Sequence, residues 1–408
     1  MEEKTKGKFG STLAACYLGS VNQAVITNLV AVLFVSLSGL YGFSGVWQLG
    51  LLVAVNFCAQ LAADLILSVL IDRLPYRVIV LCAVALSCVG LLLLGSLPFF
   101  LEADKMFAGL IAATVVFSFS GGMLEVVTTP IVDSLPHTGS KGAAVSFLHS
   151  FYAWGQAAAV AGTALFVFFA GAQSWMYIVF VWALIPAAAF GIFCFCPIHK
   201  RPQKPAAEKK AELFSPYLAV CLVAIMLGGG TETIMNQYVA TFGKLSLGFS
   251  PLISDLAGMC LFSLLLGTGR VLYAVLGDKM NLGRFLCATA LGSLGLFLVA
   301  GLVPVPAVSL VCCVLAGFST SLLWPGTLVL AGKRFPLSGA WIFALLAIFG
   351  DVGAAVFPLG LGFAADGLDL VLGAGMGLKA AFALFSVVPL LCFICHVYLY
   401  RSDKKEKK

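Results

Sequence analysis

Long apolar stretches alternate with short polar segments along the whole chain. A helix needs about 20 mostly apolar residues to cross the hydrocarbon core of a bilayer, and twelve stretches are long enough. The predicted spans are residues 10–37, 44–71, 77–98, 106–133, 142–170, 174–197, 214–242, 250–277, 283–303, 306–331, 338–365 and 371–400. The pattern therefore predicts an all-α membrane protein with twelve transmembrane helices.

The amino-acid composition also excludes other classes of protein. Apolar residues make up 61% of the chain and charged residues only 10%, against about 25% charged residues in an ordinary soluble domain. This excludes a water-soluble globular protein, and the high hydrophobicity excludes disorder. The 13 cysteines are scattered through the apolar stretches and lack the spacing of a zinc site. We expect them to be small buried apolar side chains, and we expect no metal and no cofactor.

The basic residues predict the orientation. Most of the 24 Lys and Arg residues lie at the two termini and in the even-numbered connections, whereas the odd-numbered connections hold only Lys105 and Lys244. Because basic loops remain cytoplasmic, we expect both termini in the cytosol and the protein in the plasma (inner) membrane. The charged start, Met1 to Lys8, is not followed by a small-residue cleavage site, so we expect the first helix to be retained. The net charge of +6 belongs to these clusters and predicts no nucleic-acid partner.

The chain divides into two similar halves. Residues 199–212 form the most polar internal segment and contain Pro202 and Pro205, so we predict a cytosolic linker there. It separates a bundle of six helices at 1–198 from another at 213–408. Three pairs of motifs occur in the same order in both halves: Leu70-Ile71-Asp72-Arg73 with Leu276-Gly277-Asp278-Lys279, Pro130 with Pro325, and Gly142-Ala143 with Gly339-Ala340. Such repeats predict two pseudo-symmetric bundles.

The turn after span 2 carries a family motif. Its sequence, Ser68-Val69-Leu70-Ile71-Asp72-Arg73-Leu74-Pro75-Tyr76-Arg77, resembles the Gly-x-Leu-Ala-Asp-Arg-x-Gly-Arg-Arg loop of the major facilitator superfamily of secondary transporters. Asp72, Arg73 and Arg77 match, while both glycines are replaced. The resemblance, which covers the whole chain, implies transport by alternating access. We expect Asp72 to lie at the N-terminus of span 11, and Asp278 at that of span 5, where helix dipoles favour carboxylates. The alternative is a plain turn with topology charges.

Four further segments resemble the fucose permease-like family of sugar–proton symporters. They are Leu124–Pro130, Ser146–Gly155, Glu232–Tyr238 and Leu322–Thr327. The resemblance implies that polar side chains at the His149 and Tyr152 positions contact a sugar. In span 1, where these symporters have an acidic residue, this chain has Asn22, Gln23 and Asn28. A sugar is therefore only one candidate substrate.

Six ionisable residues lie at bilayer depth and are functional candidates, because an ionisable group inside the membrane is costly: Asp64, Glu125, His149, Glu232, Arg270 and Asp351. We expect Glu125 to carry the coupling proton, since apolar surroundings disfavour the charged form of a carboxyl. His149 is expected to share that work or to hydrogen-bond substrate. For both residues the alternative is a structural role in the helix core.

Span 7 and span 11 contain further candidates. Glu232 and Asn236 are four apart and share a helix face. The run Gly228-Gly229-Gly230 is expected to loosen span 7 and to free carbonyl groups, as in discontinuous transporter helices. The alternative is a small-residue packing seam. Asp351 is expected either to face the cavity or to meet a polar group of span 2. Asp64 and Arg270 are expected to pair with neighbours, and the alternative is that they face the cavity and touch substrate.

These arguments predict three sets of site residues. The proton-coupling set is Glu125, Glu232 and Asp351. The substrate-binding set is Asn22, Gln23, Glu125, His149, Tyr152, Gln156, Glu232, Asn236 and Trp324. The set of gate or structural charges is Asp64, Asp72, Arg73, Arg77, Arg270 and Asp278.

The leading hypothesis is a proton-coupled symporter of a small polar organic solute, monomeric and surrounded by lipid. The alternative within transport is a proton-driven exporter of drugs or metabolites. A membrane-embedded enzyme is disfavoured, because the sequence lacks a His-Glu-x-x-His pair, a Gly-x-Ser-x-Gly elbow and a Walker-type loop.

Overall fold

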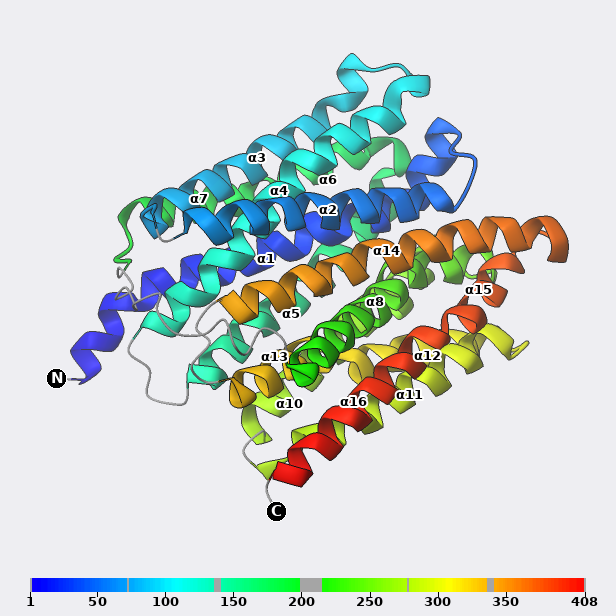
Figure 1. Cartoon of the computed structure of the whole chain (residues 1–408). Helices are drawn as coiled ribbons and strands as arrows, with labels where there is room; N and C mark the ends of the chain where they lie inside the picture. The colour runs from blue at the N-terminus through cyan, green and yellow to red at the C-terminus, as the bar shows by residue number, and fades with distance from the viewer. Residues whose placement is uncertain are drawn as a thin grey trace. The chain divides into compact units, whose positions relative to one another are not determined.

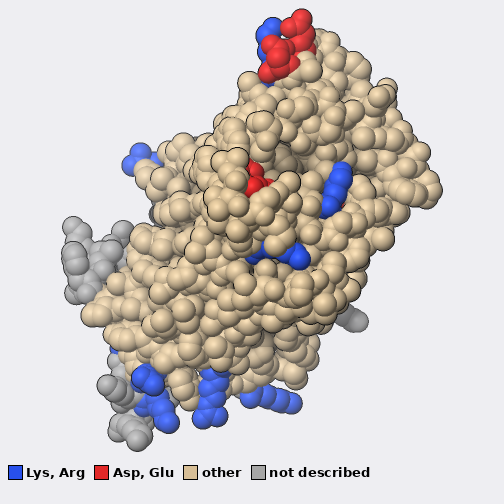
Figure 2. Space-filling view, turned by 90° about the vertical axis from the view of Figure 1, so that its right-hand side faces the viewer, with Lys and Arg blue, Asp and Glu red and all other residues tan. Residues whose placement is uncertain are grey.

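The computed structural model describes residues 2–71, 73–135, 141–198, 215–276, 279–335 and 341–406. Within these ranges twelve helices are long and apolar enough to cross a membrane, and there are no strands. This confirms the twelve predicted spans and the all-α class. Figure 2 shows one face, made almost entirely of uncharged residues. The predicted linker and the predicted gate residues Asp72 and Asp278 lie outside the described residues.

The helices group into two compact units, which we describe separately. One contains Met1–Ser44 and Val55–Lys204, and the other contains Gly45–Ala54 and Pro205–Lys408. The ten residues Gly45–Ala54, which the sequence assigned to the first bundle, thus have their contacts mainly in the second unit.

The helices of the first half follow one another with short connections (Figure 1). They are α1 (Glu2–Tyr41), α2 (Trp47–Leu70), α3 (Tyr76–Phe100), the short η1 (Ala103–Lys105), α4 (Met106–Ser134), α5 (Lys141–Ala170), the short η2 (Ala172–Ser174), α6 (Trp175–Trp182) and α7 (Leu184–Phe195). Helices α6 and α7 together make span 6.

The second half has the same number of spans, built from more helical pieces. They are α8 (Pro216–Leu245), α9 (Pro251–Ile253), the π-helix η4 (Ser254–Cys260), α10 (Leu261–Leu276), α11 (Leu282–Leu302), α12 (Pro306–Thr320), α13 (Leu323–Arg334), α14 (Trp341–Leu372), α15 (Gly377–Phe385) and α16 (Val387–Glu406). Spans 8, 10 and 12 are therefore each interrupted.

The glycine run in span 7 does not interrupt the helix, so the expectation of a loosened span was wrong. Helix α8 is continuous, and its glycines face neighbouring helices. A Cβ at Gly228 would lie 3.0 Å from the Cβ of Leu323, and one at Gly230 would clash with the ring of Phe357. On α14, a Cβ at Gly353 would overlap the backbone of Met226. The glycines therefore form the alternative, a packing seam between helices.

The start of α2 is fixed to α14 by one carboxylate. The backbone N–H groups of Val46 and Trp47 donate to Oδ1 and Oδ2 of Asp366 at 3.0 and 2.7 Å. The Trp47 ring also stacks on Phe363, with 5.8 Å between centroids. The first N–H groups of a helix have no partner within the helix, so Asp366 satisfies two of them from another helix.

Replacing Asp366 should destabilise the second unit. We expect Asp366→Ala to lower the free energy of unfolding by about 0.5–2 kcal/mol, as loss of a helix cap does. Thermal unfolding of the purified protein, followed by tryptophan fluorescence, would measure this. Asp104→Ala, which removes an exposed carboxylate, is the matched control. Equal midpoints for the two variants would show that the Asp366 contacts add nothing.

Candidate functional site

In the first unit, the predicted coupling residue contacts a predicted binding residue. Glu125 on α4 accepts a hydrogen bond from Gln23 on α1, with 2.8 Å between Nε2 and Oε2. Both side chains are partly buried. An amide can donate to a carboxylate and, after turning over, accept from a carboxylic acid. This partner can therefore hold Glu125 in either protonation state.

A polar face of α5 lies close to α1. His149, Tyr152 and Gln156 are spaced by three and four residues and share one side of the helix. The Tyr152 hydroxyl accepts a hydrogen bond of 3.4 Å from Asn28 Nδ2, which also donates to the Ala24 carbonyl at 2.8 Å. Gln156 is fully buried, while His149 and Tyr152 are partly buried.

Asn22 is oriented differently from Gln23. It is fully buried, and its Oδ1 accepts a hydrogen bond of 3.0 Å from Ser87 on α3. This contact connects two helices within the unit.

Helix α2 carries a polar stripe that the sequence analysis missed as a unit. Gln60 Nε2 donates to Asn56 Oδ1 at 2.6 Å, and Asn56 Nδ2 donates to the Ile26 carbonyl of α1 at 3.1 Å. Asp64, one turn further, is 2% exposed. The spacing of these three residues by four was the available signal. A Cβ at Gly122 would clash with the Gln60 carbonyl, so this glycine allows α4 to approach the stripe.

The two described arginines of the family motif have different surroundings. Arg73 is exposed. Arg77 donates from Nη1 to the carbonyls of Phe193 and Cys194 at 2.8 and 2.6 Å, and from Nη2 to that of Cys196 at 2.6 Å. Basic side chains favourably bind the last carbonyls of a helix, so Arg77 fixes the end of α7 to α3.

The central feature of the second unit is an ion pair. Arg270 on α10 lies with Nη2 at 3.0 and 3.2 Å from the two carboxylate oxygens of Glu232 on α8. Its Nε donates to the Ser321 carbonyl at 3.3 Å. This confirms that Arg270 pairs with a neighbour and shows the neighbour to be Glu232.

The chain around Ser321 explains why a carbonyl is available there. Helix α12 ends at Thr320 and α13 begins at Leu323. Pro325 has no N–H to donate to the carbonyl four residues earlier, which is that of Ser321. A Cβ at Gly269 would clash with the Ser321 side chain, so this glycine lets α10 approach the break. The sequence thus both frees the carbonyl and brings Arg270 to it.

Glu232 is also the most accessible residue of α8 between positions 227 and 243. Every other residue from 227 to 243 is buried, including Asn236 one turn further on, whereas the Glu232 side chain is 14% exposed. Asp351 on α14 is 1% exposed.

Two aromatic residues of this unit mainly pack. Trp324 lies against α8 and α14, where a Cβ at Gly229 would come 2.7 Å from its ring and one at Gly350 would clash with it. Tyr238 is fully buried and donates to the Pro358 carbonyl at 2.9 Å. His396, which the sequence analysis did not place in a site, is buried on α16 with Nε2 3.2 Å from the Thr327 hydroxyl of α13.

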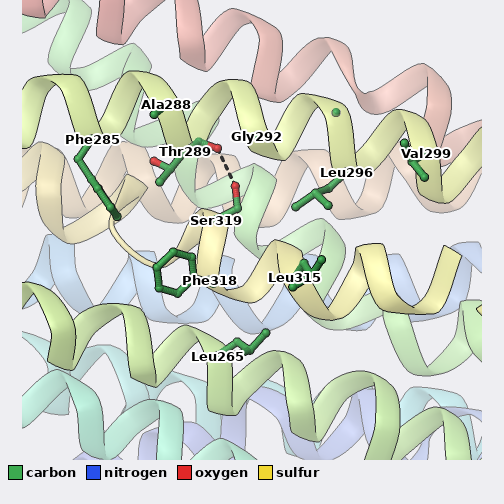
Figure 3. A pocket seen from close by; sticks show the side chains of 11 residues that line it. Leu265, Phe285, Ala288, Thr289, Gly292, Leu296, Val299, Leu315, Phe318 and Ser319 are labelled. Carbon is green, nitrogen blue, oxygen red and sulfur yellow. Dashed lines mark hydrogen bonds between the residues drawn. The ribbon is translucent and has the colours of Figure 1, made fainter. Parts of the chain in front are cut away.

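A pocket of about 590 Å³ lies elsewhere, among α10, α11 and α12. Figure 3 shows that its walls are mostly apolar, with Leu265, Leu296, Leu315 and Phe318 around a hydrogen bond from the Ser319 hydroxyl to the Thr289 carbonyl of 2.7 Å. None of the predicted site residues lines it.

Comparison with known proteins identifies the family. The sequence profile described as the Major Facilitator Superfamily matches residues 13–358. A comparison with curated protein sequences finds no match.

Solved structures share the fold. The E. coli fucose:proton symporter FucP, solved in the outward conformation, is similar with a TM-score of 0.67 and 15% identity, over 96% of this chain and 99% of that chain. A bacterial homologue of the human lysosomal transporter Spinster, in an inward-facing and occupied conformation, is similar with a TM-score of 0.73 and 13% identity, over 96% of both chains. At these identities the likeness shows the twelve-helix architecture of two six-helix bundles.

The ion pair of the second unit should be costly to break. We expect Arg270→Gln to lower the free energy of unfolding by about 3–5 kcal/mol, because it leaves a charge buried alone, and the double variant with Glu232→Gln to recover most of the loss. Thermal unfolding measures both. The control is the exposed pair of Lys105 and Glu102, 3.2 Å apart, where neutralising either partner should change stability by about 0–1 kcal/mol. A double variant as unstable as Arg270→Gln would contradict the pairing.

Proposed function

The chain belongs to the Major Facilitator Superfamily, and on this premise we propose that it is a proton-coupled symporter of a small polar organic solute. As a member of this superfamily it is a multi-pass membrane transporter and not an enzyme. The proposed cycle is alternating access, in which the solute site opens to one side of the membrane at a time.

The contact between Gln23 and Glu125 carries the proposal of proton coupling. One hydrogen bond of Glu125 comes from the neutral amide of Gln23 at 2.8 Å, whereas Glu232 is paired with a guanidinium. The Gln23 amide can keep a hydrogen bond to Glu125 in either protonation state, so a proton can bind and leave without loss of this contact. Glu232 and Asp351 are secondary candidates for the same role.

Polar uncharged side chains support a polar solute. Asn22, Asn28, Tyr152 and Gln156 offer amide and hydroxyl groups, which are suited to hydroxyl-bearing ligands, and we propose His149 as a further contact. In the second unit, Asn236 and Trp324 are the proposed additional contacts. Similarity to the fucose:proton symporter supports a sugar as one candidate, and the cytosolic gate is proposed to rest on Asp72 and Asp278.

Glu125→Gln should uncouple transport. Proteoliposomes with an inward proton gradient would first be screened with radiolabelled sugars and sugar acids for a solute that accumulates. We expect the variant to lose uphill accumulation and to retain exchange of pre-loaded solute, because the amide keeps the shape but cannot carry a proton. Glu102→Gln, the same change at an exposed position, should accumulate normally. Unchanged accumulation by Glu125→Gln would show that the proton is carried elsewhere.

In the proposed topology the protein lies in the plasma membrane, and both of its termini face the cytosol. In a variant without native cysteines, Ser44→Cys lies after span 1 and Ser402→Cys lies at the C-terminal end of span 12. A membrane-impermeant maleimide should label Ser44→Cys in intact cells and Ser402→Cys only after permeabilisation. The reverse pattern would overturn the orientation derived from the basic residues.

A further inference from the structure

Arg270 has an unusual position among the basic residues. In the described spans every other Lys and Arg lies within about one turn of a span end, whereas Arg270 lies deeper within Pro251–Leu276. A basic side chain at that depth is costly and marks a functional site by default. Arg270 therefore requires an explanation beyond membrane topology.

The surroundings of Arg270 hold the guanidinium in place. Ser321 accepts from Nε, and the Glu232 carboxylate lies on Nη2. The carbonyl belongs to the break between α12 and α13, and α12 packs against both α8 and α10 (Figure 1). The Arg270 and Glu232 side chains are 9% and 14% exposed, so the pair is largely buried and the carboxylate is its more exposed member.

Stability alone does not account for this pair. Well-packed apolar residues of similar volume often stabilise a protein as much as a buried ion pair. Arginine is, however, the side chain best suited to binding a carboxylate in a dry place, since it is always charged, weakly hydrated and rich in donors. The space beside Nη2 of Arg270 already holds one carboxylate, that of Glu232. Its size and polarity therefore suit a carboxylate.

We infer that Arg270 is the binding group for the carboxylate of an anionic organic solute, and that Glu232 occupies this place when the solute is absent. The inference rests on the proposed transport of a polar solute. It specifies the chemical class of that solute, which carries a carboxylate. Ser321 positions the guanidinium, and Glu232 is the internal competitor of the ligand.

Chemical rescue tests the inference without a known solute. Glu232→Ala removes the internal carboxylate and leaves space beside Arg270. Sodium acetate is titrated at pH 7 against the purified variant, and thermal unfolding is recorded with sodium chloride at equal ionic strength and with acetamide as neutral isostere. A ligand that binds the folded state raises the midpoint in a concentration-dependent way. We expect a saturable rise with acetate only.

Two controls locate the effect. Glu232→Ala with Arg270→Ala should lose the rise, and Glu125→Ala, which vacates a carboxylate beside Gln23 rather than arginine, should not show it. Equal responses of the single and double variants, or an equal rise with acetamide, would overturn the inference. If Glu232→Ala does not fold, the same titrations on Glu232→Ser, which also leaves space beside Arg270, decide in the same way. Because no transport is measured, failure here leaves the Glu125 experiment as a separate test of proton coupling.

Discussion

A charge placed among apolar helices has to be compensated within the protein, and the polar chemistry of this chain follows from that requirement. The two units meet it differently. In the first, the Glu125 carboxylate accepts a hydrogen bond from the amide of Gln23. In the second, the Glu232 carboxylate is held by the guanidinium of Arg270. The first arrangement suits a group that gains and loses a proton, and the second suits a place where one anion replaces another.

Close helix packing is what brings these groups together. Gly122 allows α4 to approach the backbone of Gln60, and Gly269 allows α10 to approach Ser321. A Cβ at either position would clash with the neighbouring helix. The hydrophobic effect contributes little to the association of helices inside a membrane. Small residues let the helices pack closely and so stabilise their association. The glycines beside the polar residues are therefore part of how the site is positioned.

The fold could be predicted because span length and basic loops depend on local composition, which the sequence displays directly. The positions at which helices are interrupted were harder to predict than the spans. The Gly228–Gly230 run permits either a break or a close approach, and the outcome depends on Leu323, Trp324 and Phe357 of other helices. Pro325 was a better signal, because it frees the Ser321 carbonyl wherever the neighbouring helix lies. The stripe of Asn56, Gln60 and Asp64 was also visible in its spacing.

The partner of Arg270 illustrates the limit of sequence reasoning. Depth along a span follows from counting residues, but the rotation of one helix against another does not, so the sequence did not name the partner of Arg270. In the structure Gly269 lets α10 approach the break in span 10, and Arg270 Nη2 lies 3.0 Å from Glu232. The carboxylate and the freed carbonyl then share one guanidinium. The Arg270 guanidinium can therefore exchange the Glu232 carboxylate for another carboxylate, while its hydrogen bond to the Ser321 carbonyl keeps the guanidinium oriented.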